Sequence, residues 1–296
     1  MQNKKFFLSI ARMNRKALYI LSILLTSHIL HAESSNPDQK IEFKAFKKSG
    51  IKLHVFKPEK WKKSDKRTAI VFFFGGGWNG GTPKQFYPHC RHLSNKGLVA
   101  ISAEYRTKKS HNTEPLHCVE DGKSAIRWVR KNAGVLGIDP KKVVAAGGSA
   151  GGHVAACTGT VSGFESESLK ISSIPSALIL FNPVCDTSPA GYGNSRLGKD
   201  WMKISPLHHI SIKTPPTCIF HGKADTTVPF SNVFQFKTKM DELGLRCELH
   251  AYEDQKHGFF NFGRGNGSAY TDTVKKMDSF LDSLGLIGNP KKRNKK

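Results

Sequence analysis

A serine flanked by glycines, where an apolar strand pattern gives way to a helix pattern, constrains the fold of this chain most. The run 142–146 leads into Gly147-Gly148-Ser149-Ala150-Gly151, and small residues at 153–157 continue as a helix pattern. A turn this sharp forces Ser149 into a strained backbone conformation, and a side chain at either outer glycine would collide with neighbouring backbone. The turn would present the serine hydroxyl above a sheet, as a nucleophile requires. A glycine-rich connection in another α/β protein, such as a nucleotide loop, is the alternative.

A glycine-rich loop upstream supplies the second feature that a nucleophilic serine needs. The apolar run 69–74 has the pattern of a buried strand and leads directly into Gly75-Gly76-Gly77-Trp78. Glycines allow the backbone to approach a substrate closely and to turn its N–H groups toward it. We expect the N–H groups of Gly76, Gly77 and Ala150 to form an oxyanion hole.

Candidate acid and base residues follow two further strand patterns. Asp225 comes after the run 217–222, and His257 follows the alternating run 247–252. The order Ser149, Asp225, His257 is that of the catalytic triad of α/β-hydrolases, in which each member lies on a loop after a strand. In this interpretation the serine attacks the ester carbonyl, the histidine transfers its proton, and the aspartate holds the histidine in one tautomer.

Four segments are the most specific part of a resemblance that spans residues 40–285: 71–78, 147–152, 204–206 and 255–261. The chain resembles the α/β-hydrolase superfamily, in particular its acetyl esterase/lipase branch related to hormone-sensitive lipase. It is also similar to secreted bacterial carbohydrate esterases. The resemblance implies an α/β-hydrolase fold and hydrolysis of acyl esters, for which we expect no cofactor and no metal.

The chain departs from that family at one position of the glycine loop. A histidine usually precedes the glycines in the related lipases, and Phe74 stands there instead. We therefore expect packing of Phe74, and not a polar side chain, to hold the loop. Phe74 and Trp78 flank the glycines, and their bulk favours short acyl groups over long ones.

Other charged and imidazole side chains are alternatives for the site. Asp186 follows a strand pattern and is the alternative catalytic acid, whereas Asp254 is expected to cap or bend the loop before the candidate histidine. We expect His153 and His221 to make structural hydrogen bonds. Three side chains in the segment expected to cover the pocket are either surface residues or substrate contacts: Arg196, His208 and His209.

Strand and helix patterns alternate along the chain. Strand patterns cover 52–56, 70–74, 98–103, 142–146, 177–181, 217–220 and 247–252. Helix patterns cover 86–96, 115–132, 153–157, 230–243 and 269–284, and 182–216 is loop-rich. This alternation predicts an α/β fold, with a doubly wound, mostly parallel sheet, helices on both faces, and active groups at the carboxyl ends of strands.

The first 32 residues have the composition of a secretory signal peptide. Five basic residues and no acid accompany the apolar stretch that begins at Ala17, and residues 30–32 offer a cleavage site. We expect a signal peptide over 1–32, a hydrolase domain over 33–288 that starts with a short linker to residue 39, a basic tail over 289–296, and a secreted or periplasmic protein without a stable membrane span. An uncleaved anchor is the alternative, although the apolar stretch is short for a spanning helix.

Charge and cysteine content limit the partners. The net charge is +23 at pH 7, and about +18 remains without the five basic residues of the leader. Two explanations of this positive surplus stay open: it keeps the protein soluble, or it attracts an acidic polysaccharide or an anionic cell surface. Nucleic acid is not expected, because the basic residues are not clustered with aromatics. Disulfides and free buried thiols both stay open for six cysteines whose spacing fits no ordinary zinc site: Cys90, Cys118, Cys157, Cys185, Cys218 and Cys247.

These observations predict a secreted serine esterase for short-chain acyl esters, acetyl above all, on small esters or acetylated polysaccharide. Two other functions stay open. A serine peptidase of the prolyl-oligopeptidase type uses a similar domain, together with a propeller that is not recognisable in these residues. A polyanion-binding protein that has kept the fold is the other, and the intact set of Ser149, Asp225 and His257 argues against it.

Overall fold

Apolar side chains cover both faces of the central strands of this protein. The computed structural model describes residues 36–46, 50–164 and 170–288. Strand β3 (Arg67–Phe73) places Val71 and Phe73 on one face of the sheet and Ile70 and Phe72 on the other. All four side chains are fully buried. Because neither face can meet water without cost, the strand needs a covering layer on each side.

The described residues from Pro37 onward belong to one compact unit built on an eight-stranded sheet. The strand order is β1-β2-β4-β3-β5-β6-β7-β8. The pairs β1 with β2 and β2 with β4 are antiparallel, and every other pair is parallel. The bounds of the other strands are β1 (Gln39–Lys44), β2 (Ile51–Phe56), β4 (Val99–Ala103), β5 (Ile138–Gly148), β6 (Leu178–Phe181), β7 (Thr217–Gly222) and β8 (Cys247–Tyr252). The predicted mostly parallel sheet is confirmed.

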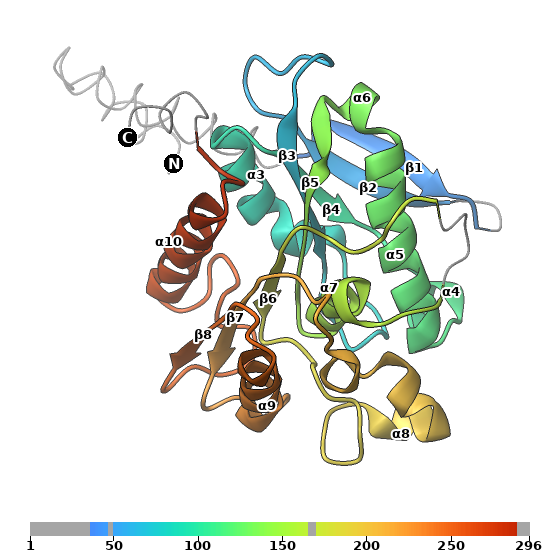
Figure 1. Cartoon of the computed structure of the whole chain (residues 1–296), viewed down its shortest axis with the longest axis vertical. Coiled ribbons are helices and arrows are strands. Elements are labelled where there is room, and N and C mark those ends of the chain that lie inside the picture. The colour runs from blue at the N-terminus through green and yellow to red at the C-terminus, as the bar shows by residue number, and fades with distance from the viewer. Residues whose placement is uncertain (1–35, 47–49, 165–169, 289–296) are drawn as a thin grey trace, which may run out of the picture. The chain divides into compact units, whose positions relative to one another are not determined.

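Helices cover both faces of the sheet, as predicted (Figure 1). One face packs against α5 (Pro115–Lys131), α7 (Ala150–Thr160) and α9 (Phe230–Glu242), and the other against α3 (Tyr87–Asn95) and α10 (Ser268–Ser283). The short elements are η1 (Pro83–Phe86), α4 (Lys108–His111), α6 (Ala133–Leu136), α8 (Asn194–Leu197), η2 (Gly198–Ile204) and η3 (Pro206–His209).

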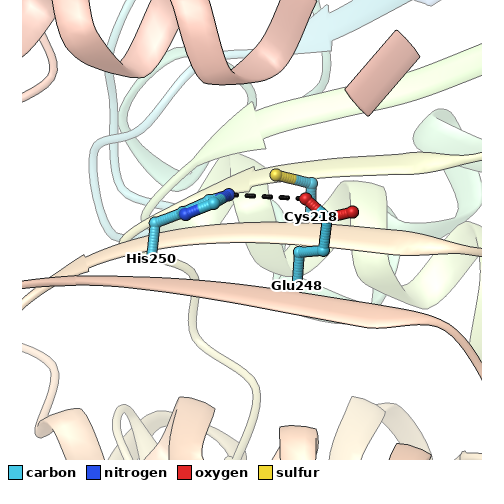
Figure 2. Close-up of side chains that lie close together, drawn as sticks. All are labelled: Cys218, Glu248 and His250. Carbon is cyan, nitrogen blue, oxygen red and sulfur yellow. Dashed lines mark ion pairs between the residues drawn. The ribbon is translucent and has the colours of Figure 1, made fainter. Parts of the chain in front are cut away.

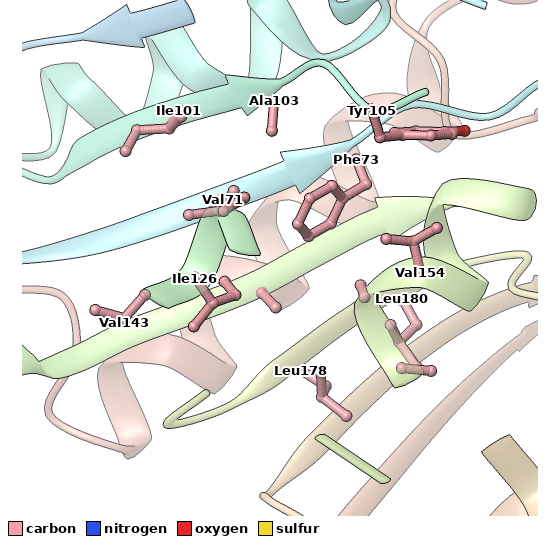
Figure 3. Close-up of a cluster of buried hydrophobic side chains, with 14 of the residues drawn as sticks. Val71, Phe73, Ile101, Ala103, Tyr105, Ile126, Val143, Val154, Leu178 and Leu180 are labelled. Carbon is pink, nitrogen blue, oxygen red and sulfur yellow. The ribbon is translucent and has the colours of Figure 1, made fainter. Parts of the chain in front are cut away.

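The core on the α5 side fixes where the carboxyl ends of the strands lie. Figure 3 shows Val71 and Phe73 of β3 between the side chains of β4 and the helix residues Ile126 and Val154. This dry contact between strands and helices stabilises the sheet by burial of apolar surface. It also holds the end of β3 beside the start of α7, which is where the glycine loop meets the candidate nucleophile.

Local sequence signals account for the start of the longest helix. Pro115 occupies the first turn of α5, where its missing N–H costs nothing. Glu114 precedes it and forms a capping box with His117, so that two otherwise unpaired backbone N–H groups find acceptors.

The structure contains elements that the sequence analysis did not predict, among them α4 and α6, and β5 begins earlier than the predicted strand 142–146. The predicted linker ends at residue 39, but Gln39 already begins β1, which pairs with β2 and forms the edge of the sheet. The loop-rich segment 182–216 contains the short helical turns α8, η2 and η3. The predicted signal peptide and basic tail lie outside the described residues and stay predictions.

Candidate active site

Ser149 lies at the turn between β5 and α7 in a backbone conformation that side chains rarely adopt. Its φ is 55° and its ψ is −123°. A Cβ added to Gly151 would lie 2.0 Å from the carbonyl oxygen of Phe73, and one added to Gly147 would lie 2.3 Å from that of Gly151. Both distances are far below a van der Waals contact, so glycine is required at both positions, as the sequence predicts. The neighbouring strand over-determines the strained turn and holds the hydroxyl in place.

The three residues predicted to form a triad lie in hydrogen-bond contact. The distance from Ser149 Oγ to His257 Nε2 is 2.9 Å, and that from His257 Nδ1 to Asp225 Oδ2 is 2.7 Å. Ser149 follows β5, Asp225 follows β7 and His257 follows β8, so three parallel strands deliver them to one edge of the sheet. With Nδ1–H donating to the carboxylate, Nε2 is free to accept the serine proton.

Asp225 is held as an anion by its hydrogen bonds. Its Oδ1 accepts bonds of 2.8 Å from the N–H of Thr227 and 3.0 Å from that of Val228. Burial alone would raise the pKa of this carboxyl group, but the hydrogen bonds from His257 and from the Val228 N–H lower it below its ordinary value. A buried carboxylate that stays ionised can both orient the histidine and stabilise its cation.

His221 is a buried, neutral histidine that contacts the turn carrying Asp225. Its Nε2 is 2.9 Å from the carbonyl oxygen of Val228 and 3.4 Å from Asp225 Oδ2. Burial lowers the pKa of His221, so the ring donates from Nε2 without carrying a charge. The prediction of a structural hydrogen bond is confirmed, and the bond fixes the turn that presents Asp225.

Three backbone N–H groups are available at the predicted oxyanion hole. Within the described ranges, the N–H groups of Gly76, Gly77 and Ala150 have no hydrogen-bond partner. Gly76 and Gly77 have φ values of 132° and 59°, and Trp78 follows with 58°. Successive left-handed residues turn their N–H groups to one side and form a concave site for an anion. This is the arrangement that a developing oxyanion needs.

Aromatic stacking holds the strand that leads into this loop, as predicted from Phe74. Phe74 is buried and stacks on Tyr105 with ring centroids 4.2 Å apart. The Tyr105 hydroxyl donates a 2.6 Å hydrogen bond to the carbonyl oxygen of Phe74. Packing of Phe74 is therefore confirmed, but the expectation that no polar side chain holds the loop is wrong, because the Gln85 side chain accepts a hydrogen bond from the Gly75 N–H.

A polar brace that the sequence analysis missed links the glycine loop to the histidine loop. Gln85 Oε1 accepts a 2.6 Å hydrogen bond from the N–H of Gly75, and its Nε2 donates a 2.9 Å bond to Asn261 Oδ1. Asn261 Nδ2 in turn donates to the carbonyl oxygen of Gly258, next to His257. The glycine loop and the loop of His257 are thus held together by one amide network.

Asn182 is the second residue that the sequence analysis missed. It follows β6, is fully buried and has a φ of 33°. Its Oδ1 accepts a 2.9 Å hydrogen bond from the N–H of Gly258, and its Nδ2 lies 3.5 Å from His257 Nε2. A buried asparagine directly after an apolar strand, at the same sheet edge as the triad, is the signal that would have found it.

The residues that cover the glycine loop have structural roles. Trp78 Nε1–H donates a 3.2 Å bond to His153 Nδ1, and His153 Nε2–H donates a 2.7 Å bond to the carbonyl oxygen of Ile204. Burial lowers the pKa of His153 to about 4, which agrees with a neutral ring. Arg196 donates a hydrogen bond to the carbonyl oxygen of Gly77. Both histidine and arginine therefore hold the loop.

The other candidate side chains lie outside the triad. Asp186 is buried and accepts hydrogen bonds of 2.8 Å from both the N–H and the hydroxyl of Ser188, and it makes no contact with His257. Asp254 is exposed and lines a cavity beside the histidine. His208 pairs with the hydroxyl of Ser205 at 2.8 Å, and His209 contacts the carbonyl oxygen of Met202 at 2.7 Å.

One cluster of metal-ligating side chains occurs among the described residues, away from the triad. Cys218 of β7 and Glu248 and His250 of β8 have ligand atoms within 4.8 Å of one another (Figure 2). Burial raises the pKa of the Cys218 thiol well above its ordinary value, and Arg246 already pairs with Glu248 at 2.6 Å. Before a metal could bind, Cys218 would have to lose its proton and Glu248 would have to leave Arg246. The cluster is therefore not a prepared metal site.

All six cysteines are buried free thiols. Burial raises the pKa of Cys157 and Cys218, so both stay protonated and behave as small core residues.

No helix in the described ranges has the length and apolarity needed to cross a bilayer.

Two family models match parts of the chain. The BD-FAE model matches residues 53–191, and the prolyl oligopeptidase family model matches residues 180–284. The first contains the glycine loop and Ser149, and the second contains Asp225 and His257.

Several solved structures and curated proteins similar to this chain are named esterases. Esterase 2 of Thermogutta terrifontis is 48% identical, with a TM-score of 0.82 over 85% of this chain and 96% of that chain. The acetylxylan esterase of Xylanibacter ruminicola is 28% identical over 92% of this chain and 55% of its own length. A probable carboxylic ester hydrolase of Mycobacterium tuberculosis, LipM, is 25% identical over 64% of this chain and 50% of its own length. The chain thus spans about half the length of these two curated relatives.

Proposed function

Because this chain belongs to the esterases of the α/β-hydrolase fold, we propose that it is a secreted serine esterase. Its substrates are short-chain acyl esters, acetyl esters above all, and its natural substrate is an acetylated polysaccharide. Ser149 is the nucleophile, His257 the general base and acid, and Asp225 the orienting carboxylate. The N–H groups of Gly76, Gly77 and Ala150 bind the oxyanion.

The contact of Ser149 Oγ with His257 Nε2 at 2.9 Å, beside the unpaired N–H groups of the glycine loop, carries this proposal. Nucleophile, base and oxyanion donors then surround one point above the end of β5. A carbonyl carbon bound there lies within reach of the serine oxygen, and its oxygen lies within reach of the donors.

The reaction follows from this geometry in two steps. Ser149 Oγ attacks the carbonyl carbon while His257 Nε2 takes its proton, and the negative charge moves to the carbonyl oxygen, where backbone N–H groups stabilise it. Collapse of this intermediate breaks the bond to the alcohol, and His257 gives its proton to the leaving oxygen. Water then attacks the acyl-enzyme with His257 again as the base, which releases the acid and restores the serine.

Two relatives support a short acyl group and a polysaccharide. The Thermogutta terrifontis esterase 2 has been solved with propionate and with butyrate bound. The Xylanibacter ruminicola relative is an acetylxylan esterase. Secretion is supported by the basic and apolar composition of the first 32 residues.

Hydrolysis of a graded ester series tests the activity directly. p-Nitrophenyl acetate, butyrate and octanoate, together with acetylated xylan, are assayed with the native chain and with Ser149→Ala. We expect Ser149→Ala to lose turnover and to keep the native melting curve, because the hydroxyl adds little to packing. Ser94→Ala, which removes a buried hydroxyl on α3, is the matched control and should retain activity. Turnover in Ser149→Ala within tenfold of the native rate would reject Ser149 as the nucleophile.

Covalent labelling supplies an independent readout. The Thermogutta terrifontis esterase 2 has been solved after phosphorylation by paraoxon. We expect paraoxon to place a diethylphosphoryl group on Ser149, located by peptide mass spectrometry, and labelling to slow strongly in His257→Ala.

A peptidase activity is the second candidate, since the prolyl oligopeptidase family model matches residues 180–284. Aminoacyl p-nitroanilides and the corresponding p-nitrophenyl esters separate the two. A comparable kcat/KM for the amide and the ester would favour the peptidase, whereas cleavage of the ester alone supports the esterase.

A further inference from the structure

A cavity of about 300 Å³ opens beside His257, and no residue of the glycine loop lines it. Its walls come from the segment after β8 and from the first residues of α10. This volume lies at the lower end of the range for small-molecule sites. His257 is itself part of the wall, so a group in this cavity lies next to the residue that transfers the proton in the proposed reaction.

The position of the cavity decides which half of an ester it receives. In the proposed reaction His257 Nε2 protonates the oxygen of the leaving alcohol, so that oxygen must lie beside the imidazole ring. The acyl group, in contrast, lies toward the oxyanion donors of the glycine loop. A cavity bordered by His257 therefore receives the alcohol portion of the substrate.

The charged groups that line the cavity carry an excess of positive charge. Lys256 and Arg264 are exposed and belong to the wall, with Asp254 as the single acid. Neither cation forms an ion pair or a side-chain hydrogen bond within the described part of the chain. Two cations without partners at the edge of a cavity favour an anionic ligand.

Polar groups at the start of α10 add to this preference. Asn266 and Ser268 line the cavity, and Asn266 Oδ1 accepts bonds from the N–H and the hydroxyl of Ser268. The N–H of Ala269, which also lines the cavity, has no acceptor among the described residues. The positive end of the helix dipole therefore faces the same space as the two cations.

We propose that this cavity binds the alcohol half of the substrate when that half is a sugar unit bearing a negative charge, as a carboxylate or a sulfate group. The hydroxyl and amide groups of the wall meet the sugar hydroxyls, and Lys256 and Arg264 meet the anion. This inference rests on the proposed esterase function and narrows its substrate to acetylated acidic sugars.

Three monoacetates with the ester on the same hydroxyl test the proposal: those of methyl glucoside, methyl glucuronoside and methyl glucoside sulfate. kcat/KM is measured for each with the native chain and with Lys256→Gln, Arg264→Gln and Arg264→Lys. We expect the native chain to prefer the charged esters. The ratio of charged to neutral kcat/KM should fall roughly fivefold for each cation removed, through KM, and recover in Arg264→Lys.

Lys213→Gln is the matched control, because Lys213 is an exposed lysine outside the cavity. An equal fall of the ratio in Lys213→Gln would assign the preference to the overall positive charge and overturn the proposal. A native chain that hydrolyses the neutral ester as well as both charged ones would overturn it too, and would leave the esterase function standing. A preference for the carboxylate alone or for the sulfate alone supports the site and identifies its anion. Hydrolysis of none of the three would reject the proposed function itself.

Discussion

The Asn182 amide oxygen accepts a 2.9 Å hydrogen bond from the N–H of Gly258, the residue next to His257. The same side chain brings its Nδ2 to 3.5 Å from His257 Nε2. The buried residue that follows β6 thus holds the histidine loop in place above the serine. Asn182 is a positioning residue, because it acts on the histidine and not on the substrate.

Asn182→Ala is expected to lower kcat roughly 10- to 100-fold with little change in KM, since the loop loses its buried acceptor and His257 moves out of line. Asn182→Asp keeps the acceptor and adds a negative charge beside the imidazole. A negative charge there favours uptake of a proton at the site, so the acidic limb of the kcat/KM profile should move to higher pH. Asn232→Ala, at a buried asparagine of α9, is the control. A profile in Asn182→Asp that matches the native one would contradict this role.

The assignment of the catalytic acid predicts unequal effects at two buried aspartates. Asp225→Asn should lower kcat by roughly 10⁴, because an amide stabilises the wrong tautomer of His257. Asp186→Asn should change the melting temperature more than the rate, since its partners are Ser188 and Ser205. Steady-state kinetics and thermal melts of both variants check this. A larger rate loss in Asp186→Asn than in Asp225→Asn would show that Asp225 has been wrongly assigned as the catalytic acid.

The glycine loop predicts a limit on acyl-chain length. A Cβ at Gly77 would meet the Tyr192 hydroxyl at 3.2 Å, and the Tyr192 ring packs on buried Trp78. This filled space should make acetate and butyrate esters far better substrates than octanoate. Tyr192→Ala should move the maximum toward longer chains, as the ester series would show. If the native chain hydrolysed the octanoate ester fastest, the hypothesis of a small acyl pocket would be wrong.

Buried histidines predict a loss of stability at mildly acidic pH. His89 is fully buried, neither ring nitrogen has a partner among the described residues, and burial lowers its pKa to about 3. Since the unfolded state takes up this proton near pH 6.5, stability is complete above that pH and falls below it.

His89→Phe should remove this contribution and relieve an unpaired polar group. We expect the unfolding free energy to rise by about 1–3 kcal/mol at pH 7. Between pH 4 and 6, its slope against pH should decrease by about 1.4 kcal/mol per unit. Urea unfolding at a series of pH values measures both. Parallel curves for the two proteins would show that His89 does not take part.

The fold was predictable where each residue carries its own signal. The apolar runs that end in glycine at Gly75 and Gly147 located the central strands and the turn that holds the serine, because burial on both faces leaves no other pattern. Strand β1 was missed for the opposite reason: it lies at the edge of the sheet and none of its side chains is fully buried. The short turns of 182–216 were missed because helices of four to seven residues show no clear periodicity.

The amide pair of Gln85 and Asn261 was unpredictable because the two partners are distant in sequence. Gln85 and Asn261 are 176 residues apart and form their bond only once the sheet has brought two loops together. Nothing in the sequence around either residue marks it. The triad was easier, since serine, aspartate and histidine after strands form a pattern that can be read along the chain.

The separation of 108 residues between Ser149 and His257 has a consequence for the order of events during synthesis and folding. A chain emerging from the ribosome carries Ser149 long before His257, and β8 must add to the far edge of the sheet before the two residues can meet. A truncated or half-synthesised chain therefore holds an ordinary, unreactive hydroxyl. The onset of hydrolysis during refolding would report the arrival of the last strand.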